Sequence, residues 1–274
     1  MTRFRAISVA ELGTVLDWAA VEGWNPGLGD AAAFHAADPE GFFLATQDGV
    51  PVAAISVVNH SEDFAFLGLY ICRPDFRGTG IGYRLWQHAL THGEGRTVGL
   101  DGVPAQQANY SKSGFVLAGE TVRYVGNVTP VASGFRLANP DDIPALFALE
   151  AEASAWRKAD YMRAWFTNTD DRKTLVAERA GMPVGVATVR KCRIGAKIGP
   201  LVAPDAETAR ALIGHAATLF GEEVTLDVPS TAPALAALCR DLQLEPGFNT
   251  ARMYRGTVKM PPPGIYAVAT LELG

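Results

Sequence analysis

Apolar runs of strand length alternate along the chain with longer stretches in which apolar residues recur every three or four positions, as on one face of a helix. The Asp48-Gly49 pair between two such runs is a strong hairpin signal, and Pro74 ends a third run. In the first half the pattern predicts strands at 4–8, 41–46, 50–58, 64–72, 97–101 and 115–124, and helices at 10–21, 30–37, 80–93 and 106–113. We therefore expect a mixed α/β (α+β) fold with a largely antiparallel sheet and one strand–loop–helix–strand crossover.

The second half of the chain repeats the first. Residues 49–55, GVPVAAI, match residues 181–187, GMPVGVA, and the strand 98–101 matches 224–227. Arg123-Tyr124 likewise matches Met253-Tyr254, so the offset stays at about 130 residues. The repeat predicts two tandem domains, 1–126 and 135–274, each a mostly antiparallel twisted sheet flanked by helices. The linker between them is the turn-rich segment 127–134, NVTPVASG.

Composition narrows the class of protein. The chain has 274 residues, of which 48% are hydrophobic and 19% are charged, as in an ordinary soluble globular protein. Its net charge of -5 argues against a nucleic-acid binder. The three cysteines lie far apart and form no metal-binding pattern, which favours reduced thiols in a cytoplasmic protein. No apolar run is long enough for a membrane span, and Glu11 and Asp17 interrupt any signal-peptide core. We expect a monomer or a homodimer.

The most informative segment is CRPDFRGTGIGYRLW, residues 72–86, where three alternating glycines precede a predicted helix. The first N–H groups of a helix have no partner within the helix, and they form an anion site together with the helix dipole. Glycines let a phosphate approach the backbone, and Arg77 adds a positive charge. The segment therefore predicts a pyrophosphate-binding loop.

Two familiar nucleotide-binding motifs fit these glycines less well. A P-loop requires Lys-Ser/Thr after the last glycine, whereas Tyr83 follows Gly82 here. A Rossmann fingerprint would explain Asp101 at the end of the next strand, but the spacing is G-x-G-x-G and the preceding strands are antiparallel. A glycine turn that serves packing alone stays open.

The segment 77–82, RGTGIG, fits the Q/R-x-x-G-x-G/A pattern of the GNAT superfamily of acyl-CoA N-acyltransferases, which the first half resembles. The later segment 109–115, NYSKSGF, looks like that family's N/LY-x-K-x-G-F segment, and the order of elements is also similar. The whole chain resembles bacterial tandem-GNAT proteins, in which a second GNAT-like module follows the first.

The resemblance implies an acyl-CoA co-substrate, acetyl-CoA above all, and assigns its site. It places the pantetheine arm against the strand backbone and the pyrophosphate in the loop, and it gives Asn109 contact with the pantetheine arm. Tyr110 would donate a proton to the departing thiolate, since a phenol stays protonated at neutral pH; a half-buried packing role is the alternative for Tyr110. The cofactor-binding residues so implied are Leu69, Tyr70, Ile71, Cys72, Arg77, Gly78, Thr79, Gly80, Ile81, Gly82, Asn109 and Tyr110.

The general base is harder to assign. Many family members place a glutamate on the strand before the loop, but residues 64–72 contain no acidic residue. The candidates are Asp101, Glu22 and a chain of waters. Asp101 has a counterpart, Asp227, in the second copy, which favours a structural role for both.

We assign the acceptor-binding site to the loop EGWNPGLGD, residues 22–30. This loop has no counterpart in the second copy, and in the family the loop at this place overhangs the acceptor site. Glu22, Trp24, Asn25 and Asp30 are therefore the acceptor-binding candidates, and their acidity favours a cationic acceptor. A capped turn, with Asp30 as the N-cap and Trp24 as a core anchor, is the alternative.

The second copy has lost the phosphate loop. Its counterpart reads VAPDAET, residues 202–208, with two carboxylates and no glycine or arginine. Tyr110 aligns with Cys239, and Gly114 with Gln243. We therefore expect one active domain. The resemblance implies that it is an N-acetyltransferase, and we expect it to act on a small-molecule amine by direct transfer in a ternary complex, without a metal. A non-enzymatic acyl-CoA-binding or regulatory protein and a peptide or protein N-acetyltransferase are the alternatives.

Overall fold

The structure is a computed structural model that describes residues 1–274. The first copy contains β1 (Thr2–Ala6), α1 (Val9–Val21), α2 (Asp30–Ala37), β2 (Phe42–Gln47), β3 (Val50–Asn59), β4 (Phe64–Cys72), α3 (Ile81–Leu90), β5 (Thr97–Gly102), α4 (Gln107–Lys112) and β6 (Val116–Asn127). The second contains β7 (Arg136–Leu137), α5 (Ile143–Ser154), α6 (Ala159–Phe166), β8 (Arg172–Arg179), β9 (Met182–Lys191), β10 (Ala196–Ala203), α7 (Ala206–Phe220), β11 (Glu223–Pro229), α8 (Pro233–Asp241), β12 (Glu245–Arg255) and β13 (Ile265–Ala267). The mixed α/β fold and the repeated order of elements are confirmed.

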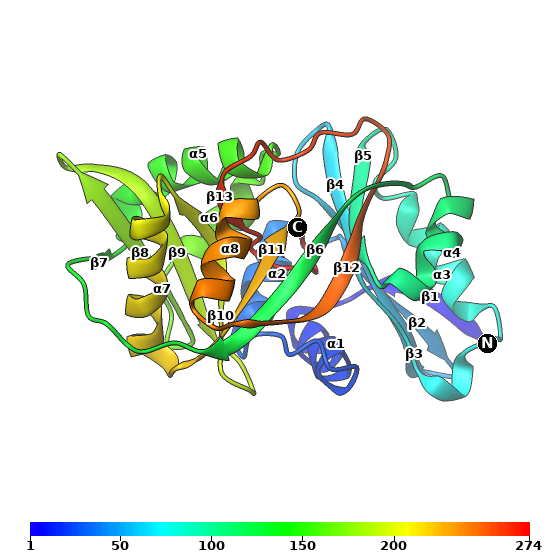
Figure 1. The fold of residues 1–274 in the computed structure, drawn as a ribbon. Helices are drawn as coiled ribbons and strands as arrows, with labels where there is room; N and C mark the ends of the chain where they lie inside the picture. Colours follow the sequence, from blue (N-terminus) through cyan, green and yellow to red (C-terminus); the bar gives the residue numbers. More distant parts are fainter.

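The two copies share one continuous sheet, which runs in the order β1-β2-β3-β4-β5-β12-β6-β11-β10-β9-β8-β7. Only β4–β5 and β10–β11 are parallel pairs, and the remaining pairs are antiparallel. The order reads the same from either end when each strand is replaced by its counterpart in the other copy. Each copy has therefore given one strand to the other: β12 pairs with β5, and β6 pairs with β11. Figure 1 shows β6 and β12 crossing between the two halves.

This exchange changes the meaning of the predicted boundary at residues 126 and 127. The strand β6 continues to Asn127, which pairs with Glu223 of β11. Within the predicted linker, the N–H groups of Val128 and Val131 donate to carbonyls of Glu222 and Gly214. The chain passes from one copy to the other inside the sheet, so the sequence boundary does not separate two independent sheets.

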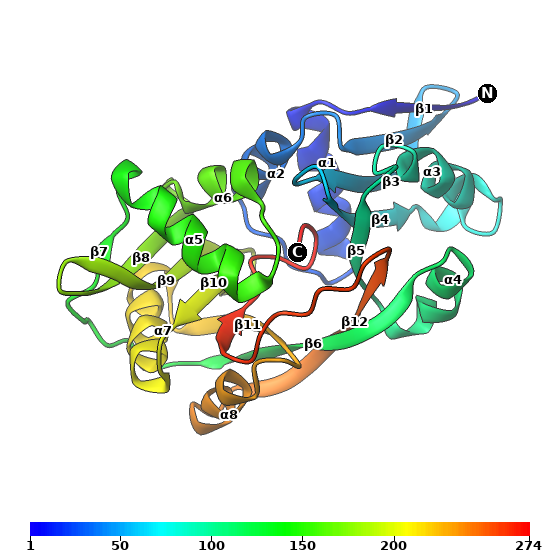
Figure 2. The ribbon, with the colours of Figure 1, turned by 90° about the horizontal axis from the view of Figure 1, so that it is seen from above.

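Helices cover the sheet in three groups. The helices α1 and α2 meet α5 and α6 in a core shared by both copies, in which Phe34 stacks on Trp165 at 5.8 Å between ring centroids. The helices α3 and α7 pack on the strands of their own copies, over separate cores. Figure 2 shows the shared helices between the two halves. None of the helices is long and apolar enough to cross a membrane.

One predicted helix begins later than expected. The helix expected at 80–93 is α3, Ile81–Leu90, because Gly80 adopts a left-handed conformation (φ 77°) that a helix does not continue through. At the C-terminal end of the chain, β13 ends at Ala267, and the residues beyond it leave the sheet and run between the two copies.

Candidate active site

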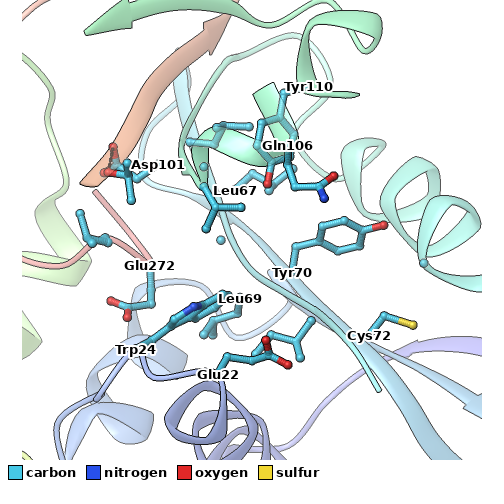
Figure 3. Close-up of a pocket in the computed structure, with 18 of the residues that line it drawn as sticks. Glu22, Trp24, Leu67, Leu69, Tyr70, Cys72, Asp101, Gln106, Tyr110 and Glu272 are labelled. Carbon is cyan, nitrogen blue, oxygen red and sulfur yellow. Dashed lines mark hydrogen bonds between the residues drawn. The ribbon is translucent and has the colours of Figure 1, made fainter. Parts of the chain in front are cut away.

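The parallel strands β4 and β5 diverge, and the main cavity opens where they part. They pair only from Phe64 to Leu67 on β4. Leu69 then takes a left-handed conformation (φ 48°), and the register between β3 and β4 shifts at the same level. From Gly68 to Cys72 no strand pairs with this edge of β4, so its backbone faces a cavity of about 800 Å³ (Figure 3).

The glycine loop closes one end of the cavity. Gly78 and Gly80 have φ values of 75° and 77°, which favour glycine. Gly80 is the N-cap of α3 and no side chain caps this helix, so its first N–H groups are available to an anion. Arg77 is held beside them: its Nε donates to the Cys72 carbonyl (2.9 Å) and its Nη2 to Glu22 (2.5 Å). These features fit a pyrophosphate group.

In the second copy, the protein's own chain occupies both the helix N-terminus and the gap between the parallel strands. At the start of α7, Asp205 accepts from the N–H of Thr208 (2.8 Å) and pairs with Arg179 (2.5 Å), so a carboxylate occupies the helix N-terminus. The gap between β10 and β11 is occupied by β13, which pairs with β10 from Leu201 to Ala203. The protein thus covers, with its own chain, the edge that stays open in the first copy.

Tyr110 of α4 lies in the wall of the cavity opposite the loop 22–24. Its ring stacks on Trp86 (5.5 Å between centroids), and a Cβ at residue 102 would lie 2.1 Å from the ring, so glycine is required there. Burial, and then the neighbouring Tyr70, raise the pKa of Tyr110 to about 12. The phenol has no hydrogen bond within the chain and borders the cavity. It is therefore a protonated donor aimed at a space that a substrate could fill.

The other predicted cofactor residues fall into two groups. The cavity is bordered by Leu69, Tyr70, Ile71, Cys72, Arg77, Gly78, Gly80 and Gly82. Thr79, Ile81 and Asn109 do not border it. Thr79 donates to the Phe76 carbonyl (2.7 Å) and Ile81 is buried in the core. Asn109 donates to Gln106 (2.7 Å) and borders a smaller adjoining cavity that Tyr70 and Tyr110 share.

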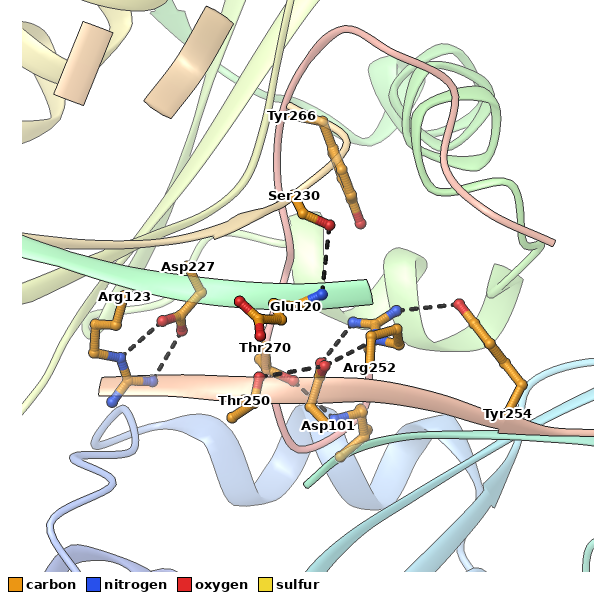
Figure 4. A network of polar contacts seen from close by, with 12 residues as sticks. Asp101, Glu120, Arg123, Asp227, Ser230, Thr250, Arg252, Tyr254, Tyr266 and Thr270 are labelled. Carbon is orange, nitrogen blue, oxygen red and sulfur yellow. Dashed lines mark hydrogen bonds and ion pairs between the residues drawn. The ribbon is translucent and has the colours of Figure 1, made fainter. Parts of the chain in front are cut away.

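Asp101 does border the cavity, but its carboxylate is already engaged. Arg252 of β12 donates to both its oxygens (2.9 and 2.5 Å), and Thr250 adds a longer bond. The second copy contains the matching pair: Arg123 of β6 donates to both oxygens of Asp227 (2.7 and 2.9 Å; Figure 4). Both pairs join a strand of one copy to the exchanged strand of the other. The carboxylate of Asp101 is therefore already paired with Arg252.

The acceptor loop 22–30 divides between the cavity and the contact of the two copies. Glu22 and Trp24 border the cavity. Asn25 and Asp30 do not: Asn25 hydrogen-bonds the backbone of Ile194, and Asp30 is fully buried against Arg190. Asp30 is also the first residue of α2, whereas the N-cap is Gly29. Neither side chain reaches the cavity, because both fasten the two copies together.

The sequence patterns missed the contribution of the second copy to this cavity. Arg123, Phe248, Leu271 and Glu272 all border it, and the last three belong to the second half of the chain. Local motifs give no signal for them, because strand exchange and the course of the C-terminal segment bring them there. The sequence alignment pairs Arg123 with Met253, one residue away from its structural counterpart. Asp227 lies opposite Arg123 and Asp101 lies opposite Arg252, so Arg252 is that counterpart.

This geometry, two copies of one fold with a single open acyl-CoA cleft, is that of a tandem GNAT acyltransferase. A family model described as "Acetyltransferase (GNAT) family" matches residues 10–115, and one described as "Acetyltransferase (GNAT) domain" matches residues 146–266. The chain belongs to the GNAT family.

Particular relatives are similar over nearly the whole chain. The holothin acyltransferase of Pseudoalteromonas sp. (strain SANK 73390) is 34% identical, over 97% of this chain and 92% of its own. A putative acetyltransferase of Pyrococcus horikoshii superposes with a TM-score of 0.83 at 20% identity, covering 100% of this chain and 96% of the other. A tandem GNAT protein from the clavulanic acid biosynthesis pathway gives 0.59 at 16% identity, over 94% and 100%. These two structures share the fold.

Proposed function

We propose that the chain transfers an acetyl group from acetyl-CoA to the amine of a small-molecule acceptor. The observation that carries the proposal is the open edge of β4 with the protonated phenol of Tyr110 beside it, in the one copy that keeps the uncapped helix and Arg77. A pure acyl-CoA binder would need the edge and the loop but not the phenol. The 34% identical holothin acyltransferase supports a small-molecule acceptor and makes holothin the first one to test.

The donor is proposed to lie along the cavity. The backbone of residues 69–72 would pair with the pantetheine amides, and the start of α3 with Arg77 would hold the pyrophosphate. Arg77 also pairs with Glu22, so a bound phosphate would compete with Glu22 for the guanidinium. Glu22 and Trp24 are proposed to contact the acceptor on the opposite side.

The reaction is direct attack of the amine on the thioester carbonyl. The C–N bond forms, the C–S bond breaks, and Tyr110 gives its proton to the thiolate. The nitrogen of the intermediate then loses a proton, which restores the phenol. An acceptor that arrives as an ammonium ion must first lose one further proton to a base. The net products are the amide, free CoA and one proton.

Thiol release tests the proposal. The protein is mixed with holothin and with acetyl-, propionyl- or hexanoyl-CoA, and free CoA is followed with a thiol reagent. We expect acceptor-dependent release, fastest with acetyl-CoA. Calorimetric binding of acetyl-CoA without thiol release from holothin or a broad panel of amines and peptides would instead establish a binding protein. Release with peptides alone would establish a peptide acetyltransferase.

A further inference from the structure

Three carboxylates border the cavity: Glu22, Asp101 and Glu272. Glu22 pairs with Arg77, and Asp101 pairs with Arg252. Glu272 is only 4% exposed, yet its carboxylate takes part in no hydrogen bond or ion pair within the chain, and its Oε2 is fully enclosed. Burial of an unpartnered carboxylate is costly, and native proteins rarely leave one without a reason. Figure 3 shows this carboxylate beside Trp24, across the cavity from Tyr110.

The segment that carries Glu272 is held firmly. The N–H of Val268 donates to the Asp227 carbonyl (3.0 Å), and the N–H of Leu273 donates to Thr270 (3.0 Å). His60 of the first copy hydrogen-bonds the Leu273 carbonyl (2.8 Å). Leu273 itself is fully buried in the core shared by the two copies. Glu272 is thus fixed in place by contacts on both of its sides.

Glycines on β4 and β10 make room for this segment. A Cβ at Gly68 would lie 2.0 Å from the carbonyl oxygen of Glu272, and a Cβ at Gly199 would lie 2.2 Å from that of Val268. Gly68 immediately precedes Leu69, where β4 leaves β5, and Gly199 occupies the matching place on β10. The C-terminal segment 265–274 therefore has two roles. It covers the edge of β10 in the second copy, and it places the Glu272 carboxylate beside the open edge of β4 in the first.

The charged surroundings of Glu272 are mainly cationic. Arg123 of β6, Arg190 of β9 and Lys197 of β10 interact with it electrostatically, as does the phenol of Tyr161. None of the cationic nitrogens lies within 4.0 Å of its oxygens. Arg123 and Arg190 are each committed to another carboxylate, Asp227 and Asp30. These cations surround the carboxylate without pairing with it.

We propose that Glu272 is the base of the reaction, and takes the proton that an ammonium acceptor must lose before it attacks the thioester. This inference rests on the proposed function. The proton passes from the ammonium nitrogen to Glu272 and then to water, which leaves a neutral amine beside the thioester carbonyl; Tyr110 protonates the thiolate afterwards. The first copy thus supplies the acid, and the second copy supplies the base.

The test compares Glu272→Gln, which keeps the shape of the side chain, with Glu152→Gln, which changes an exposed glutamate of α5. We measure kcat and KM for both substrates with acetyl-CoA and the best acceptor from the panel that is an ammonium ion at neutral pH, from pH 6 to 9. The expected result is a kcat about 10²-fold or more below wild type at pH 7 in Glu272→Gln, with acetyl-CoA affinity unchanged. The deficit should shrink as pH rises, because more of the acceptor is then already deprotonated. Glu152→Gln should match wild type.

The remaining outcomes separate the two proposals. If wild type turns over and Glu272→Gln keeps its kcat and pH profile, or changes KM alone, Glu272 is not the base and the proposed function stands. If wild type binds acetyl-CoA but acylates no amine, both proposals fail. Glu272→Asp, which retracts the carboxylate by one methylene, covers the case in which the Gln variant is unstable. It should fold and retain part of the pH profile, whereas a purely structural role would give a change in melting temperature without a change in kcat.

Discussion

At the scale of the residue, Tyr110 lies in the cavity because residue 102 has no side chain, and its acidity is set by burial. Replacing Tyr110 with Phe removes the proton for the thiolate while keeping the ring against Trp86. We expect kcat to fall about 10²-fold or more, with the KM for acetyl-CoA nearly unchanged. Steady-state kinetics with thiol detection measure both. Tyr124→Phe, a change at a buried tyrosine outside the cavity, is the control, and equal kcat in both variants would remove Tyr110 from the chemistry.

Asp101 and Asp227 show why a recurring residue need not be catalytic. Each accepts two hydrogen bonds from an arginine of the exchanged strand. Breaking a buried pair leaves one charge unpaired, so Arg252→Met should lower the unfolding free energy by roughly 3–5 kcal/mol. The double variant Arg252→Met/Asp101→Leu should lose less than the single one. Urea unfolding of the two single variants and the double variant gives a double-mutant cycle. If the losses in unfolding free energy of the single variants add up to that of the double variant, the two side chains do not stabilise each other.

At the scale of the element, α3 and α7 begin alike in the fold but differ in what covers their first N–H groups. In α7 a carboxylate caps them, and in α3 nothing does. Arg77→Ala removes one charged donor beside the open N-terminus and should weaken acetyl-CoA binding by roughly 10- to 100-fold. Arg179→Ala, at the capped N-terminus, should leave it unchanged. Titration calorimetry with acetyl-CoA measures both affinities. Equal affinities in the two variants would show that the phosphates of CoA do not bind beside Arg77.

Lys197 of β10 gives the contact between the copies a dependence on pH. It donates to the Trp24 carbonyl (2.8 Å), and burial together with Arg123 lowers its pKa to about 8. An unfolded lysine has a pKa near 10.4, so above pH 8 the unfolded chain binds more protons at this residue than the folded one. Its contribution therefore makes the unfolding free energy rise with pH from about 8. Urea unfolding at pH 7.5 to 9.5 should show a smaller rise in Lys197→Met, and parallel curves would refute this assignment.

Patterns within single elements predicted the strands and one wall of the cavity. The apolar runs located the strands, and the glycine loop and NYSKSGF located one wall of the cavity. The opposite wall depends on which strands exchange and where residues 265–274 run. Both depend on packing between residues more than 100 positions apart, such as Gly68 and Glu272. No periodicity or motif encodes such a contact, so Glu272 and Arg252 could not be found from the sequence.

At the scale of the whole molecule, the second copy acts as part of the first copy's site. It has closed its own cleft with β13, it supplies β12 as the neighbour of β5, and it brings Glu272 and Phe248 to the cavity. The loop 22–30 reaches back to it through Asp30 and Asn25. Through strand exchange, a copy without a phosphate loop thus forms part of the structure around the cavity of the other.

We propose that this one site moves an acetyl group from CoA to an amine without a covalent enzyme intermediate. Mass spectrometry on a reaction of the wild-type chain with acetyl-CoA and holothin, quenched during the first turnover, separates direct transfer from transfer through the enzyme. Direct transfer gives acetylated holothin in an amount equal to the free CoA formed, and a protein of unchanged mass. An acetylated protein would rule out direct transfer, and intact acetyl-CoA beside unmodified acceptors across the whole amine panel would rule out the proposed N-acetyltransferase activity.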